Sequence, residues 1–311
     1  MNSVVIKFGG YQKPASIHNL AAVRFGEILK HELGDRISFE LIGDVLALGR
    51  GSGDLLPMVE RGELDCCYIS TVRFTGWIPE FKLLELPFVI KSRPAAIAAL
   101  NGGLGEYFSR RVREATPYRV LGFWDNGFRH FSNRVRPIRA PADCRGLRIR
   151  TQMSELHGEV FRTLGFAPVP ADIKEFVAEI AGDRFQAQDN PLTNIYNFDV
   201  HKFHRYHTLT GHSYLSRGIY CNRAAFESWP AALQTAMLQA TRAAVLAQRE
   251  LAVLEEEVAR QAIMDAGGEI VELTPHERAA FVQAVKPLHD EGRGRFGDAF
   301  ALLEAARAKV E

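Results

Sequence analysis

The sequence predicts an α/β fold with two lobes, and three observations lead to this expectation. Short apolar strand patterns alternate with helical patterns over residues 4–70 and again over residues 125–210, as is typical of parallel strands covered by helices. A chain of 311 residues is too long for one comfortable hydrophobic core, so two domains are expected. A helical pattern from Pro230 to Ala266 contains no internal glycine or proline, and it is long enough to cross both domains.

The first half of the chain reads as a strand, a helix and a second strand. A strand at residues 4–8 is followed by a loop with glycine and proline as breakers. The next helix starts at Ser16 or His18, because apolar residues then recur at steps of three and four. The later elements of this half are predicted as a strand at 37–42, a helix at 54–61, a strand at 64–70, a helix at 95–112 and a strand at 119–124.

The second half repeats the alternation and ends in the long helix. We expect strands at 147–151 and 185–188, with helices at 155–164 and 173–181. Pro230 fits a first helical turn and Gly267-Gly268 supplies the stop, which gives a helix roughly 50 Å long. Its apolar residues do not hold a strict heptad, so we expect it to tie the two domains together instead of forming a coiled coil.

Composition excludes several classes of protein. Hydrophobic residues make up 47% and charged residues 24%, which is ordinary for a soluble globular chain. The 38 basic and 37 acidic residues leave a net charge of +1, so neither nucleic acid nor lipid is an expected partner. No apolar run approaches the length of a membrane span. Residues 1–8 lead directly into a strand pattern, so the protein is either cytoplasmic or has lost a leader peptide.

Metal and cofactor sites are not expected. The four cysteines stand outside any Cys-x-x-Cys pair and are interpreted as buried thiols: Cys66, Cys67, Cys144 and Cys221. His201, His204 and His207 recur every three residues, but the histidines, including His130 and His212, are interpreted as solvated loop residues. Residues 49–53 are glycine-rich but lack the ending of a phosphate-binding P-loop, so they are interpreted as a turn into the next helix.

Two arginines and one asparagine suggest a receptor for a carboxylate. Arg150 ends the segment 146–150, Arg129 lies in the segment 127–133, and Asn190 precedes Pro191. A guanidinium cannot lose its proton at ordinary pH, so it holds an anion and does not transform it. Its planar fork meets both carboxylate oxygens, while an amide can read a neighbouring hydroxyl or keto group. We therefore predict a protein that binds small organic acids.

Short segments spread over almost the whole chain carry a family resemblance. They are Gly10-Tyr11-Gln12 with Ala15-Ser16, Val59-Glu60-Arg61-Gly62-Glu63-Leu64-Asp65, Ile78-Pro79-Glu80-Phe81, Leu86-Pro87-Phe88, Gly127-Phe128-Arg129, Arg136-Pro137-Ile138, Gly146-Leu147-Arg148-Ile149-Arg150, Leu164-Gly165, Pro168-Val169-Pro170, Gln188-Asp189-Asn190-Pro191-Leu192 and Thr210-Gly211-His212-Ser213-Tyr214. Their order and spacing resemble the solute-binding proteins of tripartite ATP-independent periplasmic (TRAP) transporters, the DctP family.

The resemblance implies a fold and a function. The fold is a two-lobed periplasmic binding protein fold, with a ligand cleft between the lobes and a long helix that spans both. We expect residues 1–125 and 213–250 to form lobe I and residues 126–212 and 251–311 to form lobe II. The hinges are expected near 125–127 and 209–213. The implied function is a periplasmic receptor, a monomer and not an enzyme, that delivers an organic acid to the membrane subunits of a TRAP transporter.

The resemblance also implies the roles of individual residues. Arg150 takes the position of the arginine that pairs with the ligand carboxylate, Arg129 that of the second arginine, and Asn190 that of the asparagine facing the ligand. Where the family usually has Asp-Gly, this chain has Gln186-Ala187, so the pocket floor can differ in shape.

Five further residues are candidates for the cleft. Gln12 and Ser16 lie in the loop that leaves the first strand at its carboxyl end, where ligands of open α/β sheets bind. Tyr68, Trp124 and Tyr214 are candidates for its apolar walls.

Alternatives remain open at this point. Arg129 can instead pair with Asp125 or Asp189, Asn190 can cap a turn, and Trp124 can belong to the core. An enzyme acting on a carboxylate substrate is one alternative function, although no Gly-x-Ser-x-Gly or His-Glu-x-x-His motif is present. A cytoplasmic carboxylate sensor is another. The ligand itself is open among sugar acids, hydroxy or keto acids, dicarboxylates and aromatic acids.

Overall fold

The computed structural model describes residues 4–310, and their strands form one sheet of nine strands. The order across the sheet is β2-β1-β3-β8-β4-β7-β5-β6, with β9 paired to β8. The strands are β1 (Val4–Gly9), β2 (Ile37–Ile42), β3 (Cys66–Ser70), β4 (Tyr118–Asn133), β5 (Arg148–Thr151), β6 (Ala167–Pro170), β7 (Ala187–Asn190), β8 (Tyr206–Asn222) and β9 (Glu269–Glu272).

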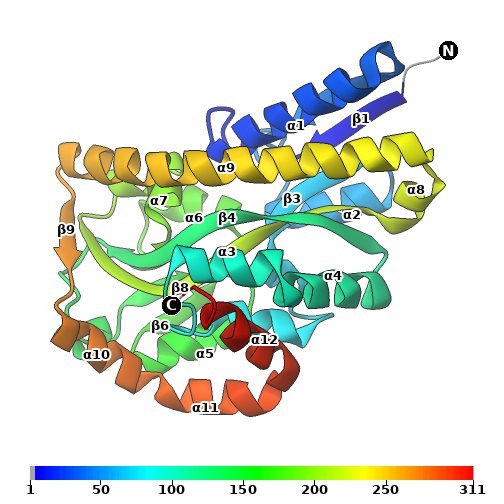
Figure 1. The fold of residues 1–311 in the computed structure, drawn as a ribbon. Coiled ribbons are helices and arrows are strands. Elements are labelled where there is room, and N and C mark those ends of the chain that lie inside the picture. The colour runs from blue at the N-terminus through cyan, green and yellow to red at the C-terminus, as the bar shows by residue number, and fades with distance from the viewer. Residues whose placement is uncertain (1–3, 311) are drawn as a thin grey trace.

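Helices pack around this sheet, which confirms the predicted α/β class (Figure 1). They are α1 (Ile17–Leu33), α2 (Leu55–Glu60), α3 (Arg93–Asn101), α4 (Gly103–Ala115), α5 (Glu155–Thr163), α6 (Ile173–Glu179), α7 (Leu192–Asn197), α8 (Arg223–Ser228), α9 (Ala231–Asp265), α10 (Pro275–Ala284), α11 (Lys286–Arg295) and α12 (Gly297–Arg307).

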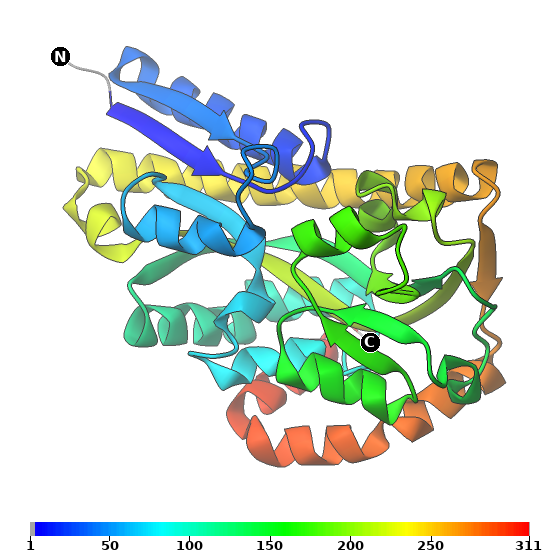
Figure 2. The same ribbon diagram turned by 180° about the vertical axis from the view of Figure 1, so that it is seen from behind.

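The sheet has a parallel group of strands at each end and a long antiparallel pair between them. At one end β1 pairs in parallel with β2 and β3, and at the other β5 pairs in parallel with β6 and β7. The long strands β4 and β8 run antiparallel to each other, and they connect the two ends because β8 pairs with β3 while β4 pairs with β7. Figure 2 shows the two groups on opposite sides of the molecule.

The long antiparallel pair is irregular where hinges were predicted. The register between β4 and β8 shifts between Asp125 and Phe128 and again between Arg129 and Phe131. Gly127 and Gly211 have φ angles of 81° and 51° in these segments, a conformation that favours glycine. Bulges of this kind bend a strand locally. The predicted lobe boundaries and the hinge movement itself remain predictions.

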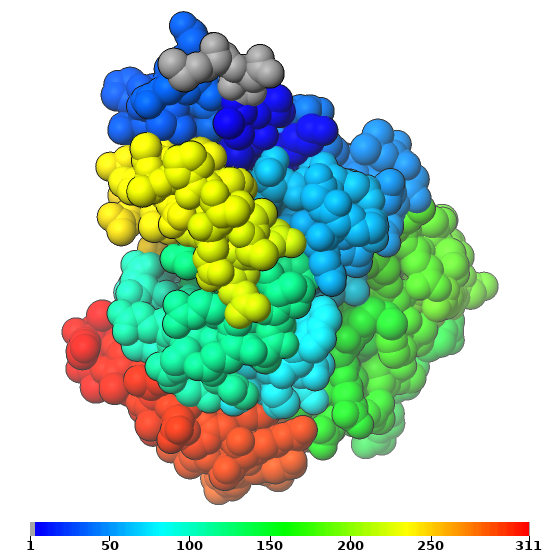
Figure 3. Space-filling model, turned by 90° about the vertical axis from the view of Figure 1, so that its right-hand side faces the viewer, coloured from blue at the N-terminus to red at the C-terminus, as the bar shows by residue number. Residues whose placement is uncertain are grey.

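Helix α9 extends along most of the molecule and packs against α1, α7 and β4. Pro230 is the residue just before the helix, and Gly267, with φ of 84°, follows its end and donates its N–H to the Met264 carbonyl. The buried face carries mainly small side chains, such as Ala236, Ala240 and Ala244, so α1 can approach closely. In the end-on view, α8 and the start of α9 (yellow) lie between the N-terminal elements and α4 (Figure 3).

Two element predictions were wrong. The helix expected at 95–112 is two helices, because the chain breaks at Gly102. The strand expected at 119–124 is only the first part of β4, and its partner β8 was not predicted at all. Strand β8 was missed because polar residues interrupt the apolar alternation that is typical of a strand. These residues are nevertheless buried, and their side chains bond to the backbone. Thr208 donates to the Ile138 carbonyl (3.0 Å) and Ser216 to the Trp124 carbonyl (2.8 Å).

The four cysteines are all buried and free, as predicted, although Cys66 and Cys221 are opposite each other on β3 and β8. Among residues 4–310, no helix is both long enough and apolar enough to span a bilayer.

Candidate functional site

A cleft lies between the two ends of the sheet and is lined by residues from both. It encloses about 570 Å³ of space, including space open to solvent. Among residues 4–310 no acidic side chain lines it, and four arginines do: Arg73, Arg129, Arg150 and Arg217. Asn126, Asn190, Asn194, Gln152 and Tyr11 add hydrogen-bonding groups. Six apolar residues share this lining: Ile69, Val72, Met153, Ala171, Ile173 and Phe198. A surface of this kind suits a small anion.

Arg150 is held at the base of the cleft by its own strand. It pairs with Val169 of β6 and Gln188 of β7 in the sheet, and only 5% of the residue is exposed. Its Nε donates to the Ala171 carbonyl at 2.9 Å, while its two Nη groups have no hydrogen-bond partner among residues 4–310. Burial, helped by the nearby Arg129, lowers the pKa of Arg150 to about 10, so the guanidinium stays charged at neutral pH. It therefore presents four unbonded N–H groups to an incoming anion.

Arg129 is different because the protein neutralises it. Its Nε lies 2.5 Å from Asp189 Oδ2 and its Nη2 lies 3.0 Å from Asp189 Oδ1, with both side chains buried. Burial opposes ionisation of Asp189, but Arg129 and the His157 and His212 rings hold the pKa of its carboxyl well below the usual range. Arg129 was predicted either to bind the ligand or to pair with Asp125 or Asp189, and the structure shows the pair with Asp189. Asp125, the other candidate partner, pairs with Arg93 at 2.8 Å.

Asn190 ends β7 and lies beside Arg129 at the carboxyl edge of the parallel strands. Its Oδ1 accepts from Arg129 Nη1 (3.1 Å) and from Asn194 Nδ2 (3.3 Å), and its Nδ2 donates to Gln188 Oε1 (2.5 Å). These bonds fix the amide orientation in the cleft lining. The residue before α7 is Pro191, and no side chain caps that helix, so Asn190 does not act as a cap.

Gln12 and Ser16 do not line the cleft. Gln12 lies one layer behind it and donates from Nε2 to Asn194 Oδ1 at 2.9 Å. Ser16 caps α1, where its hydroxyl accepts from the Asn19 N–H at 3.3 Å.

The three aromatic candidates are also outside the lining. Trp124 is fully buried, 5.2 Å from the Tyr68 ring and 6.0 Å from the Phe8 ring, so it belongs to the core. Tyr68 lies under the cleft floor, where its ring contacts that of Tyr11 at 5.5 Å. Tyr214 donates to Asp125 Oδ1 at 2.7 Å and stabilises the bulged part of β4. The sequence suggested these three aromatic residues as cleft walls because the alternation of side chains along a strand does not reveal which face of the sheet is covered by helices.

The cleft also contains residues that the sequence did not reveal. Asn194 lies on α7, four residues after Asn190, and donates from Nδ2 to Asn190 Oδ1 at 3.3 Å. Arg217 lies in the unpredicted strand β8 and gave no signal. Arg73 and Ser52 reach across the cleft to Asp172, with the Ser52 hydroxyl 2.8 Å from Asp172 Oδ2. These bonds link the two sides of the cleft.

The histidine interpretation was wrong, because all five candidate histidines are buried and none is a solvated loop residue. Burial lowers the pKa of His130 and of His204 to about 3 and that of His207 to about 4. His204 and His207 are instead tied to protein groups, Nδ1 of His204 to the Ser132 hydroxyl and Nε2 of His207 to the His204 carbonyl. Within residues 4–310, no set of three or more His, Cys, Asp or Glu side chains could hold a metal ion. The glycine-rich segment 49–53 is a turn into α2, as predicted.

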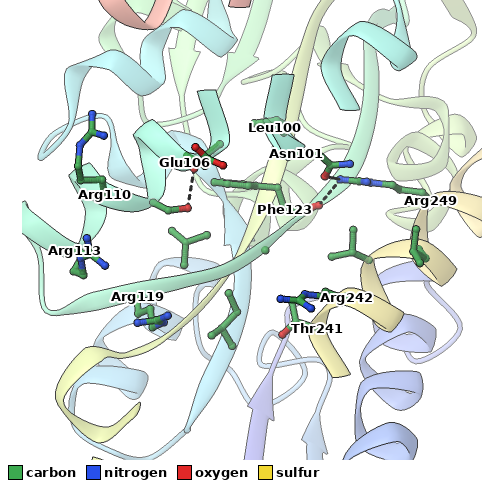
Figure 4. A pocket seen from close by; sticks show the side chains of 17 residues that line it. Leu100, Asn101, Glu106, Arg110, Arg113, Arg119, Phe123, Thr241, Arg242 and Arg249 are labelled. Atoms are coloured by element: carbon green, nitrogen blue, oxygen red, sulfur yellow. Dashed lines mark hydrogen bonds between the residues drawn. The ribbon is translucent and has the colours of Figure 1, made fainter. Parts of the chain in front are cut away.

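A larger groove lies between α4, β4 and α9, with about 1390 Å³ of space including open solvent (Figure 4). It carries five arginines and one acid around its rim: Arg110, Arg113, Arg119, Arg242, Arg249 and Glu106. Three of these arginines, 110, 113 and 242, are exposed. The cleft is the better candidate site, although it is smaller, because three of its four arginines are buried and fixed by bonds to neighbouring residues: Arg129, Arg150 and Arg217.

Comparison with known proteins gives consistent results. The family described as "Bacterial extracellular solute-binding protein, family 7" (DctP) matches residues 8–294. The chain is 26% identical over 309 residues to the C4-dicarboxylate-binding periplasmic protein DctP of Rhodobacter capsulatus, covering 98% of this chain and 92% of that protein. It is 25% identical over 280 residues to the 2,3-diketo-L-gulonate-binding periplasmic protein YiaO of Escherichia coli, covering 90% and 84%.

The fold has close structural counterparts. The crystal structure of a TRAP periplasmic solute-binding protein from Shewanella oneidensis with bound succinate superimposes with a TM-score of 0.92. The identity is 20%, and the match covers 98% of this chain and 99% of the other. This likeness confirms the two-lobed fold. Neither the enzyme nor the cytoplasmic sensor receives support from these comparisons. The chain belongs to the DctP family of bacterial extracellular solute-binding proteins, whose members are binding proteins of transporters and not enzymes.

Proposed function

We propose that this protein is the periplasmic receptor of a TRAP transporter and that it captures a small organic acid on Arg150. The observation that carries the proposal is the buried Arg150 guanidinium, which lines the cleft. Its two Nη groups form no hydrogen bond with any of residues 4–310. A bidentate carboxylate would satisfy both groups in one plane. Asn190, fixed by its bonds to Arg129 and Gln188, offers an amide beside it.

The relatives support an organic acid as the solute. The R. capsulatus protein is named for C4-dicarboxylates, the E. coli protein for 2,3-diketo-L-gulonate, and the S. oneidensis structure contains succinate. All three ligands carry at least one carboxylate. The conserved chemistry is therefore the carboxylate, which fits a single guanidinium anchor.

Capture would proceed by closure of the two lobes. The acid enters the open cleft, pairs with Arg150, and the lobes swing together about residues 125–127 and 209–213, as periplasmic binding proteins do. The irregular β4–β8 register at these positions supports the proposed hinges. Contacts such as that of Ser52 with Asp172 then hold the closed form, whose surface the membrane subunits recognise. The receptor acts as a monomer.

The test is binding of organic acids to purified protein. A thermal-shift screen over mono-, di- and sugar acids should reveal ligands, because a solute that binds only the folded state raises its melting temperature. Calorimetry should then show that Arg150→Ala weakens binding by roughly 30- to 5,000-fold, since it leaves a carboxylate without its buried partner. Arg150→Lys should recover only part of the loss, because an ammonium lacks the planar fork.

Arg148→Ala is the matched control. Arg148 lies on the same strand two residues away, but it bonds to the Asp183 carbonyl outside the cleft, so its removal should leave affinity unchanged. Equal affinity of Arg150→Ala and the unmodified protein for every acid would overturn the anchor role.

A further inference from the structure

The outward face of helix α9 carries an exposed apolar group of side chains. Four of its large apolar residues are between 53% and 66% exposed: Leu246, Val253, Leu254 and Val258. The opposite face of the helix is buried against α1, α7 and β4. Helix α9 lies in front of the sheet in Figure 1 and behind it in Figure 2. Single exposed apolar side chains are normal, but a contiguous group on one helix indicates contact with another molecule.

The charges of this part of α9 are separated along the helix. Residues 241–249 contain two arginines and no acid, and we call them the basic half. Residues 250–258 contain four glutamates and no basic residue, and we call them the acidic half. Arg242, Glu250 and Glu257 are exposed, and none of the three forms an ion pair within the part of the chain that the structure describes. Both halves therefore keep their charge available to a partner.

The groove of Figure 4 lies beside the basic half. Arg242, Leu246 and Arg249 line it from α9, and three more arginines line it from α4 and β4. Five arginines against one glutamate in the lining leave four positive charges in excess, although the whole chain has a net charge of only +1. Arg249 donates only to neutral oxygens, those of Asn101 and Phe123. A surface of this kind attracts an acidic segment.

The outward face of α9 complements itself when its order is reversed. Side chains at steps of three or four residues share one face of a helix, and on this face they are Arg242, Leu246, Arg249, Glu250, Val253 and Glu257. The midpoint of the series lies between residues 249 and 250. A second α9 placed antiparallel about this midpoint would pair Arg242 with Glu257, Leu246 with Val253, and Arg249 with Glu250. A twofold axis would form each of these pairs twice.

Other arrangements lack this match. Two α9 helices in parallel would place Arg242 opposite Arg242 and Glu257 opposite Glu257, and like charges at such short range are unfavourable. An anionic membrane surface would attract the basic half but repel the four glutamates of the acidic half. The antiparallel pair satisfies both halves at once and covers the exposed apolar side chains between them.

We propose that two copies of this chain associate through α9, with the acidic half of each helix against the basic half and the groove of the other. The matched positions span about four turns of helix, or about 24 Å, which is short for a stable dimer interface. The association is therefore weak and depends on protein concentration. No residue of α9 lines the cleft, so each copy keeps its own site and captures solute as a monomer. The proposal does not rest on which solute binds.

Analytical ultracentrifugation of the purified protein tests the association. The mean mass should rise from that of one chain toward that of two as the concentration increases from about 1 µM to about 500 µM. Arg242→Glu places two glutamates opposite each other at both ends of the contact, so it should weaken the association by about tenfold or more. Glu257→Arg should have the same effect, because it places two arginines there.

The double variant is the decisive measurement. Arg242→Glu combined with Glu257→Arg exchanges the two charges, so it should restore the association to within about threefold of the unmodified protein. A merely structural effect of either substitution would not be rescued by the other. Melting temperatures check that all three variants fold.

Arg295→Glu is the matched control. It makes the same charge change at an exposed position on α11, on the opposite side of the molecule from α9 (Figure 1), and should leave the association unchanged. The mass of a single chain at every concentration would overturn the proposal and leave the exposed face to a different protein. Association that survives Arg242→Glu, or a double variant as weak as the single ones, would overturn it as well. None of these outcomes bears on Arg150, whose role is tested separately by solute binding.

Discussion

The cleft and the groove of Figure 4 are both rich in arginine, but they hold their guanidiniums in different ways. In the cleft each arginine is anchored by backbone, amide or carboxylate groups, as Arg150 is by the Ala171 carbonyl and Arg129 by Asp189. In the groove Arg110, Arg113 and Arg242 are exposed, and Arg110 pairs with Glu114, which is exposed as well. Arg119 lies over the Phe226 ring, and Arg249 donates to Asn101 and to the Phe123 carbonyl. The groove is larger, yet it offers charge without fixed direction.

The comparison shows that burial, more than the number of charges, marks a binding site. An exposed guanidinium already satisfies its N–H groups with water and gains little from a ligand. A buried one depends on protein or ligand partners, so each free N–H group contributes to affinity and selectivity. The following predictions test this contrast, beginning with the largest effect.

Asp189→Asn should be the most damaging substitution, because it leaves the Arg129 cation buried without its counter-ion. We expect a loss of about 3–5 kcal/mol in the free energy of unfolding, measured by urea denaturation at pH 7. Asp183→Asn is the matched control. Asp183 pairs with Arg134 at 3.5 Å but is fully exposed, so its urea midpoint should not move. Similar midpoints for the two variants would contradict the distinction between buried and exposed pairs.

Glu85 provides the opposite case, a buried acid near Arg129 and Asp189 that forms no ion pair with any of residues 4–310. Burial raises the pKa of Glu85 from 4.5 to about 7. A raised pKa in the folded state favours folding below pH 4.5, and this contribution is lost as the pH rises through about 7. Glu85→Gln should therefore be more stable than the unmodified protein by about 3 kcal/mol at pH 8, with the difference vanishing near pH 4.5.

The measurement for Glu85 is the free energy of unfolding against pH for both proteins. Glu155→Gln removes an exposed acid on α5 and is the control. Its free energy of unfolding should change with pH in the same way as that of the unmodified protein. A constant offset between Glu85→Gln and the unmodified protein would show that packing, and not ionisation, separates them.

The smallest effect is expected in the groove. Arg242→Ala should change the free energy of unfolding by less than about 0.5 kcal/mol, because the side chain is exposed. Its affinity for any acid that binds the cleft should equal that of the unmodified protein. A tenfold loss of affinity would show that the groove participates in binding and would break the comparison.

The parts of the fold that the sequence predicted are those with local signals. Residues 37–42 alternate as a strand, and Ser16 and Gly34 mark the two ends of α1, so these elements were found. Arg150 and Asn190 were found because each closes a short strand segment with recognisable neighbours. Strand β8 was missed, because buried Thr, His and Ser side chains replace the apolar alternation that a strand usually shows.

Residues of the site that depend on distant pairing could not be predicted. Arg217 meets Tyr11 across 206 residues of sequence, and only the pairing of β8 with β3 and β4 brings them together. The Arg129–Asp189 pair was one of two open alternatives, because Asp125 was also a candidate partner and lies much nearer to Arg129 in the sequence. Trp124 could be core or wall until the position of the aromatic rings around it was known.

The backbone passes between the two ends of the molecule through β4, β8 and α9, and α11 then leads it back to α12, which packs against α3 and α4. A protease that nicks any one of these passages leaves the other covalent links in place. The fragments should then stay together in a non-denaturing gel and separate only in detergent. A receptor built in this way tolerates damage outside the cell better than one whose halves are tied by a single linker.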